Sequence, residues 1–590
     1  MNARVRFVVP AALASLFGFT ALPAAGATQP AESALGNIKH IVVIYQENHS
    51  FDNLYGNWER VNGLSHASPA NTVQVSQGGV AFGCLKQNDV NLTTPPQPAS
   101  CTDTLNGITS AFTNQPFNID DYIKSTDTTC PAPGVFATNG VLNGSGLPGG
   151  CTEDLVHRYY QEQYQLNGRG LNGVTQNRYV TGSDAIGLTM GVYKTHDLPI
   201  YQYLHQSGHP QYAILDKFFQ AAFGGSFLNH QWLAAAATPV FAGALNDGSS
   251  NDRHSVVDAN GMPTNYPLYT SPLGPNGSDT HPGGPRDSQL TASCHPLAPR
   301  PATPGNVVCG DFAVNTTQPW FQPYSPGTAD ARRLRPLVAN NVTRVNVTIG
   351  DELSANSVDW AWYAGGWSNA AGNVGAPGWS NGKKPTKTGG CPDSNAFTTA
   401  VWPNCPDKLF QFHHQPFNYF ANYAPGTMAR ALHLRDEQEF LQLASSSTTT
   451  QCNLKPVSFV KPIGAENEHP GYTNESAGSS HLVDLIKAVE GSACKNDTLV
   501  ISTYDEFGGQ WDHVTPPGQG GSDGVADRWG PGTRIPALII SPFLQGDFVV
   551  DHVPHDTTSI LATIEHRFGL TPLTTRDAAV HDLSSVFKAQ

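Results

Sequence analysis

Short apolar runs separated by polar, glycine-rich stretches form the pattern along this chain. Six apolar runs predict β-strands, at residues 38–46, 212–219, 344–350, 456–463, 498–505 and 535–543. Four stretches predict helices, at residues 192–206, 426–446, 480–490 and 557–568. Strands that alternate with helices favour an α/β fold, in which helices on both faces cover a mostly parallel central sheet.

Two of the predicted strands end in adjacent side chains that can bind a metal. The run IVVIYQEN ends in Glu47 and Asn48, and the run TLVISTYDE leads into Asp505 and Glu506. In α/β sheets, ligands gather at the carboxyl ends of the strands. Buried carboxylates there need a compensating positive charge, which a divalent cation commonly supplies. Two acidic pairs in surface loops are the alternative, but the shared position at strand ends favours a metal-dependent enzyme.

The two halves of this metal set must meet in space, so the pattern indicates one large catalytic domain over residues 36–590. Residues of about 60–150 and 245–330 do not fit the sheet, because they are rich in Gly, Ser, Asn, Thr and Pro and contain cysteines. They predict disulfide-stapled surface insertions that could cover the site. A second small domain in either stretch is the alternative.

The first 27 residues predict export. A basic start with Arg4 and Arg6, an apolar middle and small residues ending at Ala27 form a secretory signal peptide, so a secreted or periplasmic location is expected. No later run is long enough for a spanning helix, so no stable membrane anchor is expected. The ten cysteines of an exported chain predict disulfides, most simply between sequence neighbours: 84–101, 130–151, 294–309, 391–405 and 452–494.

The charge of the chain limits the classes of partner that it is expected to bind. The formal net charge is −14 with 33 lysines and arginines, so the chain carries no basic footprint for nucleic acid. An anionic substrate would therefore have to meet a local metal or a histidine cluster.

A candidate nucleophile lies between the two halves of the metal set. Gly224 and Gly225 permit a tight turn directly before Ser226, after the strand predicted at 212–219 and before a helix-like run. A serine at a helix start is commonly an N-cap, which is the alternative. The strand–turn–serine–helix order instead outlines a nucleophile elbow, although it is not the G-x-S-x-G signature.

Four histidines are candidates for the same site: His157, His413, His414 and His469. Each of them alone would more often be a structural residue. Beside a serine and four metal-type side chains, they become candidate phosphate-binding groups or proton shuttles.

At these positions the chain resembles a known family. The segments QENHSFDNLYG (46–56), AFGGSFLNH (222–230), ENEHPGY (466–472) and YDEFGGQWDHVTPP (504–517) resemble the motifs of a bacterial secreted phosphoesterase family, which contains acid phosphatases and phospholipases C and has an alkaline-phosphatase-like fold. The resemblance implies that one divalent metal binds to Glu47, Asn48, Ser226, Asp505 and Glu506. It also implies that Ser226 is the nucleophile, and that His157, His414 and His469 hold the phosphate with His413 close by.

Departures from the phospholipase C pattern bear on the substrate. The chain has GGSFLNH in place of a threonine motif, DEFGGQWDHV without the aspartate that follows the metal pair, and no extension beyond the region of EHRFGL. These differences favour the acid phosphatase branch. The prediction is therefore a secreted metal-dependent acid phosphatase that hydrolyses phosphomonoesters through a phosphoseryl intermediate. Its alternative is a phospholipase C that releases diacylglycerol from phosphatidylcholine.

The remaining chemistry concerns the leaving group, the metal and one neighbouring motif. His469 is the expected proton donor to the leaving oxygen. Oxygen ligands favour Ca²⁺, Mg²⁺ or Mn²⁺ over Zn²⁺ as the single metal.

Asp512 and His513 either support the metal pair or form a structural turn, and the sequence leaves both interpretations open. A binding module with a dead site would lack a residue such as Ser226 or Asp505, and neither is missing.

Overall fold

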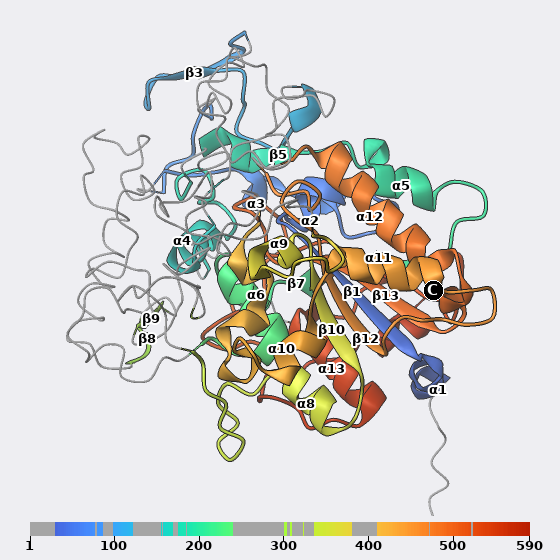
Figure 1. Ribbon diagram of the computed structural model, residues 1–590. Coiled ribbons are helices and arrows are strands. Elements are labelled where there is room, and N and C mark those ends of the chain that lie inside the picture. The colour runs from blue at the N-terminus through green and yellow to red at the C-terminus, as the bar shows by residue number, and fades with distance from the viewer. Residues whose placement is uncertain are drawn as a thin grey trace, which may run out of the picture.

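An eight-stranded sheet lies at the centre of the molecule, and helices flank it (Figure 1). The computed structural model describes residues 30–76, 79–85, 98–121, 155, 157–168, 175–183, 186–239, 300–303, 307–309, 323, 336–379, 410–470, 473–520 and 523–589. In sheet order the strands are β11 (Leu434–Asp436), β10 (Trp360–Ala364), β12 (Val457–Lys461), β1 (His40–Gln46), β13 (Thr498–Tyr504), β14 (Ala537–Ile540), β6 (Tyr212–Leu215) and β15 (Phe548–Asp551). β14 is antiparallel to both of its neighbours, and the other seven strands run in one direction. The predicted α/β fold with a mostly parallel sheet is confirmed.

β1 is the strand that places the candidate site. It pairs with β12 on one side and with β13 on the other, and it is buried from Ile41 to Gln46. A strand covered on both faces reads as a continuous apolar run, as this one does. The register pairs Gln46 with Tyr504, so the residues that follow, Glu47 and Asp505, leave the sheet side by side.

Two sets of helices cover the sheet (Figure 1). One set packs α5 (Pro199–Leu204) and α11 (Glu437–Ser446) against α12 (Glu475–Glu490), and the other packs α8 (Ile349–Ala355) and α13 (Thr558–Phe568) against α6 (Ser226–Ala235). In α12, buried Leu482, Leu485, Ile486 and Val489 recur at helical spacing. This apolar stripe is what holds an amphipathic helix on a core.

Shorter elements complete the described chain. The remaining α-helices are α1 (Pro30–Asn37), α2 (Phe51–Leu54), α3 (Pro69–Thr72), α4 (Tyr159–Leu166), α9 (Trp367–Ala371) and α10 (Met428–His433). Short strands pair as β2 (Cys101–Asp103) with β3 (Ile108–Ser110), β4 (Phe117–Asn118) with β5 (Gly191–Val192), β7 (Phe218–Phe219) with β16 (His555–Asp556), and β8 (Arg300–Thr303) with β9 (Val307–Cys309). None of these pairs joins the central sheet.

The prediction of a strand at residues 344–350 is wrong. Thr348 caps α8 instead, because its hydroxyl accepts the Asp351 N–H while the Asp351 carboxylate accepts the Thr348 N–H. This reciprocal capping box begins a helix just where the alternating valines suggested a strand. The helix predicted at 426–446 is also interrupted, since β11 lies between α10 and α11.

Two predicted disulfides are confirmed: Cys84–Cys101 and Cys452–Cys494. The pairings 130–151, 294–309 and 391–405 each involve cysteines outside the described residues. The predicted signal peptide and most of the 245–330 insertion also lie outside them. Among the described residues, no helix is both long enough and apolar enough to cross a bilayer.

Candidate active site

The five side chains predicted to bind a metal lie together at the carboxyl ends of β1 and β13 and the start of α6. Glu47, Asn48, Asp505 and Glu506 are fully buried, and Ser226 is almost so. The Asn48 amide donates to Glu506 Oε1 at 2.8 Å. The Ser226 hydroxyl lies 3.1 Å from Glu47 Oε2 and 3.4 Å from Glu506 Oε1. Segments 458 residues apart in sequence thus meet around one serine hydroxyl.

The turn before Ser226 determines where its hydroxyl points. Gly224 has a φ of +100°, and a Cβ at this position would lie 2.5 Å from the Tyr159 backbone nitrogen, so only glycine fits. Gly225 is the N-cap of α6 and Ser226 is its first residue. The N-cap alternative for Ser226 is therefore wrong, because its hydroxyl contacts carboxylates rather than capping the helix.

His157 and His469 present the same nitrogen to the carboxylates. His157 Nδ1 donates to the Leu155 carbonyl at 2.5 Å, and His469 Nδ1 donates to the Pro470 carbonyl at 2.7 Å. Their Nε2 atoms lie 3.5 Å from Glu506 Oε1 and 3.8 Å from Glu47 Oε2, respectively. Burial lowers the pKa of both rings, that of His469 to about 4. With Nδ1 on a carbonyl, Nε2 of each ring faces the site, and the lowered pKa favours the neutral ring, in which Nε2 is an acceptor.

A second histidine group stacks beside them. His414 Nε2 lies 2.7 Å from Glu47 Oε1, and the His414 ring stacks on His230 with centroids 5.3 Å apart. His413 is buried next to both rings, and neither of its nitrogens has a hydrogen-bond partner in the described part of the chain. His230 was missed by the sequence reasoning, although it lies in the segment AFGGSFLNH. Its Nδ1 lies 2.8 Å from the Ser226 carbonyl oxygen and 3.6 Å from Asp505 Oδ2, so the helical spacing of four from Ser226 was the available signal.

Lys461 is the other functional candidate that the sequence did not reveal. It ends β12, is fully buried, and places its Nζ 2.7 Å from Glu47 Oε1 and 3.2 Å from the Gln46 carbonyl. Burial alone would raise the pKa of Glu47, but Lys461 and then His414 outweigh it and hold this pKa well below its usual range. Glu47 Oε1 is thus occupied by these two residues, and Oε2 is the oxygen that faces Ser226.

The donor set fits a divalent cation. Burial and the neighbouring carboxylates raise the pKa of Asp505 and Glu506 well above their usual ranges. Asp505 Oδ2 and Asn48 Oδ1 are buried without a hydrogen-bond partner among the described residues. One lysine cannot balance three buried carboxylates, and bound Ca²⁺, Mg²⁺ or Mn²⁺ would do so with the oxygen ligands that these ions prefer. His230 and His414 also bring nitrogen atoms within 4.8 Å of a Glu47 oxygen.

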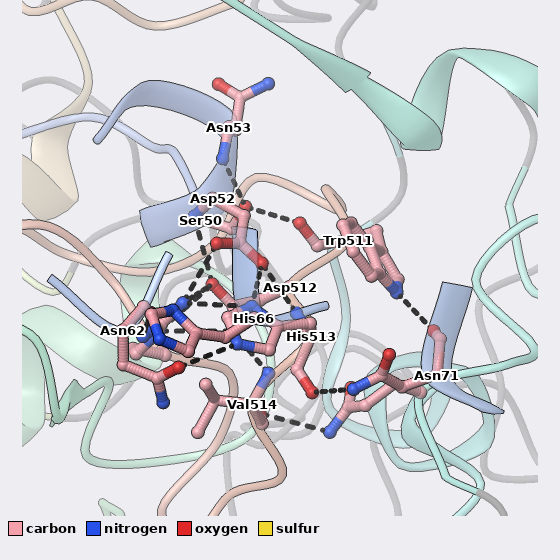
Figure 2. A network of polar contacts seen from close by, with 12 residues as sticks. Ser50, Asp52, Asn53, Asn62, His66, Asn71, Trp511, Asp512, His513 and Val514 are labelled. Atoms are coloured by element: carbon pink, nitrogen blue, oxygen red, sulfur yellow. Dashed lines mark hydrogen bonds and ion pairs between the residues drawn. The ribbon is translucent and has the colours of Figure 1, made fainter. Parts of the chain in front are cut away.

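A separate network of polar contacts joins α2 to the loop that follows Glu506, and Figure 2 shows Asp52, Asp512 and His513 within it. Asp52 accepts the His513 backbone N–H at 2.8 Å and contacts the His513 ring at 2.6 Å. Arg534 is fully buried and bridges Asp52, at 3.0 Å, and Asp512, at 3.1 Å. These contacts fasten the loop after Glu506 to α2, and the arginine supplies the compensating charge. A fastened loop is consistent with both interpretations of Asp512 and His513, support of the metal pair and a structural turn, and each stays a prediction.

Comparison with known proteins places the chain among phosphoesterases. The model of the Phosphoesterase family matches residues 38–571. Phospholipase C B from Mycobacterium tuberculosis is 36% identical over 155 residues, which cover 23% of this chain and 29% of that protein. Non-specific phospholipase C6 from Arabidopsis thaliana is 30% identical over 196 residues, which cover 30% of this chain and 35% of that protein. The matched segments thus span about a third of these relatives or less.

A solved structure also matches in part. It is a protein in the alkaline phosphatase superfamily from Vibrio parahaemolyticus, with 16% sequence identity and a TM-score of 0.20. The match covers 39% of this chain and 50% of that one.

Proposed function

The chain belongs to the phosphoesterase family, and we propose that it hydrolyses phosphate esters through a phosphoserine intermediate at Ser226. One observation carries the proposal: the Ser226 hydroxyl, at the start of α6, lies within 3.4 Å of both Glu47 and Glu506 in a buried cluster of carboxylates and histidines. A buried serine beside groups that can remove its proton or hold a cation is arranged as a nucleophile.

The metal belongs to the same proposal. Glu47, Asn48, Asp505 and Glu506 would hold it, with Ser226 as the fifth ligand. When bound, the cation would lower the pKa of the serine hydroxyl and neutralise charge on the phosphoryl group. The unsatisfied oxygens of Asp505 and Asn48 support this assignment.

The side chains perform the two chemical steps. Ser226 Oγ forms a bond to phosphorus as the bond to the leaving oxygen breaks, and the serine proton passes to solvent water. A water molecule then attacks the phosphoserine, which releases inorganic phosphate and restores the hydroxyl. The positive end of the α6 dipole lies at Ser226 and favours the anionic phosphoryl group.

The histidines bind the phosphoryl oxygens and supply the leaving-group proton. His157 and His469 have Nδ1 fixed on backbone carbonyls, so Nε2 is the atom that faces the substrate. An arriving phosphate brings negative charge, which raises the low pKa of a buried histidine and lets it carry a proton into the site. His469 is the proposed general acid, His157 and His414 are the proposed phosphate-binding residues, and His413 lies beside them.

Phosphomonoesters are the proposed substrates. A monoester dianion offers three terminal oxygens to the cation and the histidines, and it needs no room for a second esterified group. The serine in GGSFLNH and the sequence DEFGGQWDHV support this choice over the phospholipase pattern. The signal peptide predicted for residues 1–27 supports an exported enzyme. Cleavage of phosphatidylcholine is the second candidate, because the relatives from Mycobacterium tuberculosis and Arabidopsis thaliana carry the name phospholipase C.

A substrate panel separates the two candidates. We expect kcat/KM for nitrophenyl phosphate to exceed that for phosphatidylcholine in mixed micelles by at least about tenfold, or roughly 1.4 kcal/mol in transition-state binding. Release of nitrophenol and of diacylglycerol is measured on one enzyme preparation, with and without chelator. Diacylglycerol release as fast as nitrophenol release would replace the phosphatase proposal with the phospholipase one.

Lys461→Met should lower kcat/KM by about tenfold to a hundredfold, a range typical of residues that support a metal ligand. Methionine removes the charge that holds the Glu47 pKa low and frees the Oε1 atom, so Glu47 loses its fixed orientation. Lys455→Met is the matched control, because Lys455 lies two residues before the same strand and pairs with Asp359 instead of Glu47. Equal activity of the two variants would show that Lys461 has no part in the site.

A further inference from the structure

Glu162 is a buried carboxylate of α4 that the mechanism above does not use. Both of its oxygens are occupied by donors. Oε2 accepts the Gly224 backbone N–H at 2.5 Å and the Gln220 amide at 2.9 Å. Oε1 accepts the Thr533 backbone N–H at 2.7 Å and the Thr533 hydroxyl at 2.9 Å. Four hydrogen-bond donors therefore surround this fully buried carboxylate and satisfy both of its oxygens.

The backbone around the Glu162 carboxylate requires glycine at two positions. A Cβ at Gly532 would lie 2.4 Å from Glu162 Oε1, so the residue before Thr533 must be glycine for the carboxylate to enter. The Gly224 N–H that Glu162 accepts belongs to the turn with φ +100°, two residues before Ser226. Glu162 therefore holds the nucleophile turn at its positive-φ glycine.

Gln220 extends this connection to the metal-binding pair. Its amide nitrogen donates to Glu162 and also to the Ala222 and Gly224 carbonyls, at 2.8 and 3.2 Å. Its oxygen accepts the Phe507 N–H at 2.9 Å, directly after Glu506. One side chain thus joins the turn before Ser226 to the loop that carries Asp505 and Glu506.

We infer that Glu162 is a positioning residue, which acts through Gly224 and Gln220 to set the Ser226 hydroxyl at its working distance from Glu506. It touches no reacting atom. The inference rests on the proposed role of Ser226 as nucleophile. Asn229 also binds the turn, through the Ala222 N–H and the Ala222 and Gly224 carbonyls. Asn229 lies on α6 with Ser226, however, so it ties the helix to its own turn, whereas Glu162 and Gln220 tie that turn to the opposite half of the site.

Glu162→Gln is the test. The variant keeps the size of the side chain but puts an amide nitrogen where a backbone N–H, of Gly224 or of Thr533, needs an acceptor. Burial raises the pKa of Glu162 to about 8, although the four donors lower it, and in either protonation state both oxygens face a backbone donor. We expect kcat to fall at least about tenfold with KM within about twofold, because misplacement of a nucleophile acts on the chemical step.

Glu565→Gln is the matched control. Glu565 is a buried carboxyl of α13, and burial raises its pKa to about 9, so glutamine matches its neutral form. Activity should be unchanged in this variant. Bound metal, melting temperature and the rate of Ser226 phosphorylation in a rapid-quench experiment are measured for both variants. The inference predicts a slower phosphorylation rate in Glu162→Gln with metal content close to that of the control. The melting temperature should fall by only a few degrees, because one buried backbone donor is left unsatisfied, so the protein stays folded during the assay.

A double-mutant cycle adds a second readout. Gln220→Leu should lower the phosphorylation rate through the same connection. The fold-reduction of this rate in the double variant should therefore be smaller than the product of the fold-reductions in Gln220→Leu and Glu162→Gln. If Gln220→Leu does not fold, the single variant Glu162→Asp is measured in place of the cycle. We expect its phosphorylation rate to lie between the rates of wild type and Glu162→Gln.

The outcomes distinguish this inference from the function on which it rests. An unchanged phosphorylation rate in Glu162→Gln, or a loss fully matched by lost metal or lost folded protein, would overturn the positioning role. If Ser226→Ala keeps its activity, the proposed function itself fails. If Ser226→Ala is inactive and Glu162→Gln is fully active, only the inference about Glu162 fails.

Discussion

Replacing Ser226 by alanine should reduce kcat by at least about a thousandfold, the scale on which loss of a covalent nucleophile is felt. The substitution removes one oxygen atom from the first residue of α6 and leaves the helix with a good helix former. Folding should therefore be unaffected, and bound metal should be lowered only modestly because four other ligands remain. Turnover of nitrophenyl phosphate, melting temperature and metal content measure the three quantities.

Ser479→Ala is the control for that experiment. Ser479 is a fully buried serine of α12 that accepts the Ile200 backbone N–H and does not belong to the candidate ligand set. Its loss should cost a little stability and leave kcat unchanged. Comparable activities of the two serine variants would contradict the assignment of Ser226.

Removing one metal-binding carboxylate should have the second large effect. Asp505→Asn and Glu47→Gln are each expected to lower bound metal and to reduce kcat/KM by at least about a hundredfold, since the metal both activates the serine and neutralises the phosphoryl charge. The two variants change opposite ends of the chain, and the Ser226 hydroxyl contacts carboxylates from both ends, Glu47 and Glu506. Loss of metal in both would demonstrate one shared site.

Asp512→Asn serves as the matched control for the carboxylates. Asp512 is buried in the loop after Glu506, but it binds Arg534 and the Asp52 N–H instead of the candidate metal set. This variant should melt at a lower temperature, because it leaves part of a buried ion pair unsatisfied, and should keep its metal. Full activity of a demonstrably metal-free wild-type preparation would contradict the metal proposal.

The parts of the site that lie at strand ends were predictable. A buried parallel strand reads as an unbroken apolar run, and the change to Glu47-Asn48 or Asp505-Glu506 marks where it ends. Parallel neighbours end at the same edge, so the two pairs meet, as the β1–β13 register confirms. Two short motifs were therefore enough to bring together side chains from both ends of the chain.

Lys461 and Glu162 could not be found in this way. A lysine after an apolar strand is usually solvated, and only the pairing of β12 with β1 brings it to Glu47. The segment YYQEQYQL of α4 has the composition of an exposed helix, yet Glu162 is fully buried under the nucleophile turn and the Thr533 segment. Both positions depend on contacts between distant segments, which a local pattern does not contain.

The errors in the fold have local causes. The valines of 344–350 alternate like a strand, but the Thr348–Asp351 capping box starts a helix there. The true strand is β10, an aromatic run of five residues that carries no alternation because it is buried throughout. In the 426–446 stretch, three residues of β11 pair with β10 at the sheet edge and divide one predicted helix into two.

Mapping the labelled residue during turnover tests the central claim most directly. Enzyme turning over a phosphomonoester with labelled phosphorus is quenched in acid in one sample and in alkali in another, and the peptides are sequenced by mass spectrometry. The account predicts a label on Ser226 that survives acid and is lost in alkali, as a phosphoserine is. A label on His157, His414 or His469 that survives alkali and is lost in acid, with none on Ser226, would contradict it.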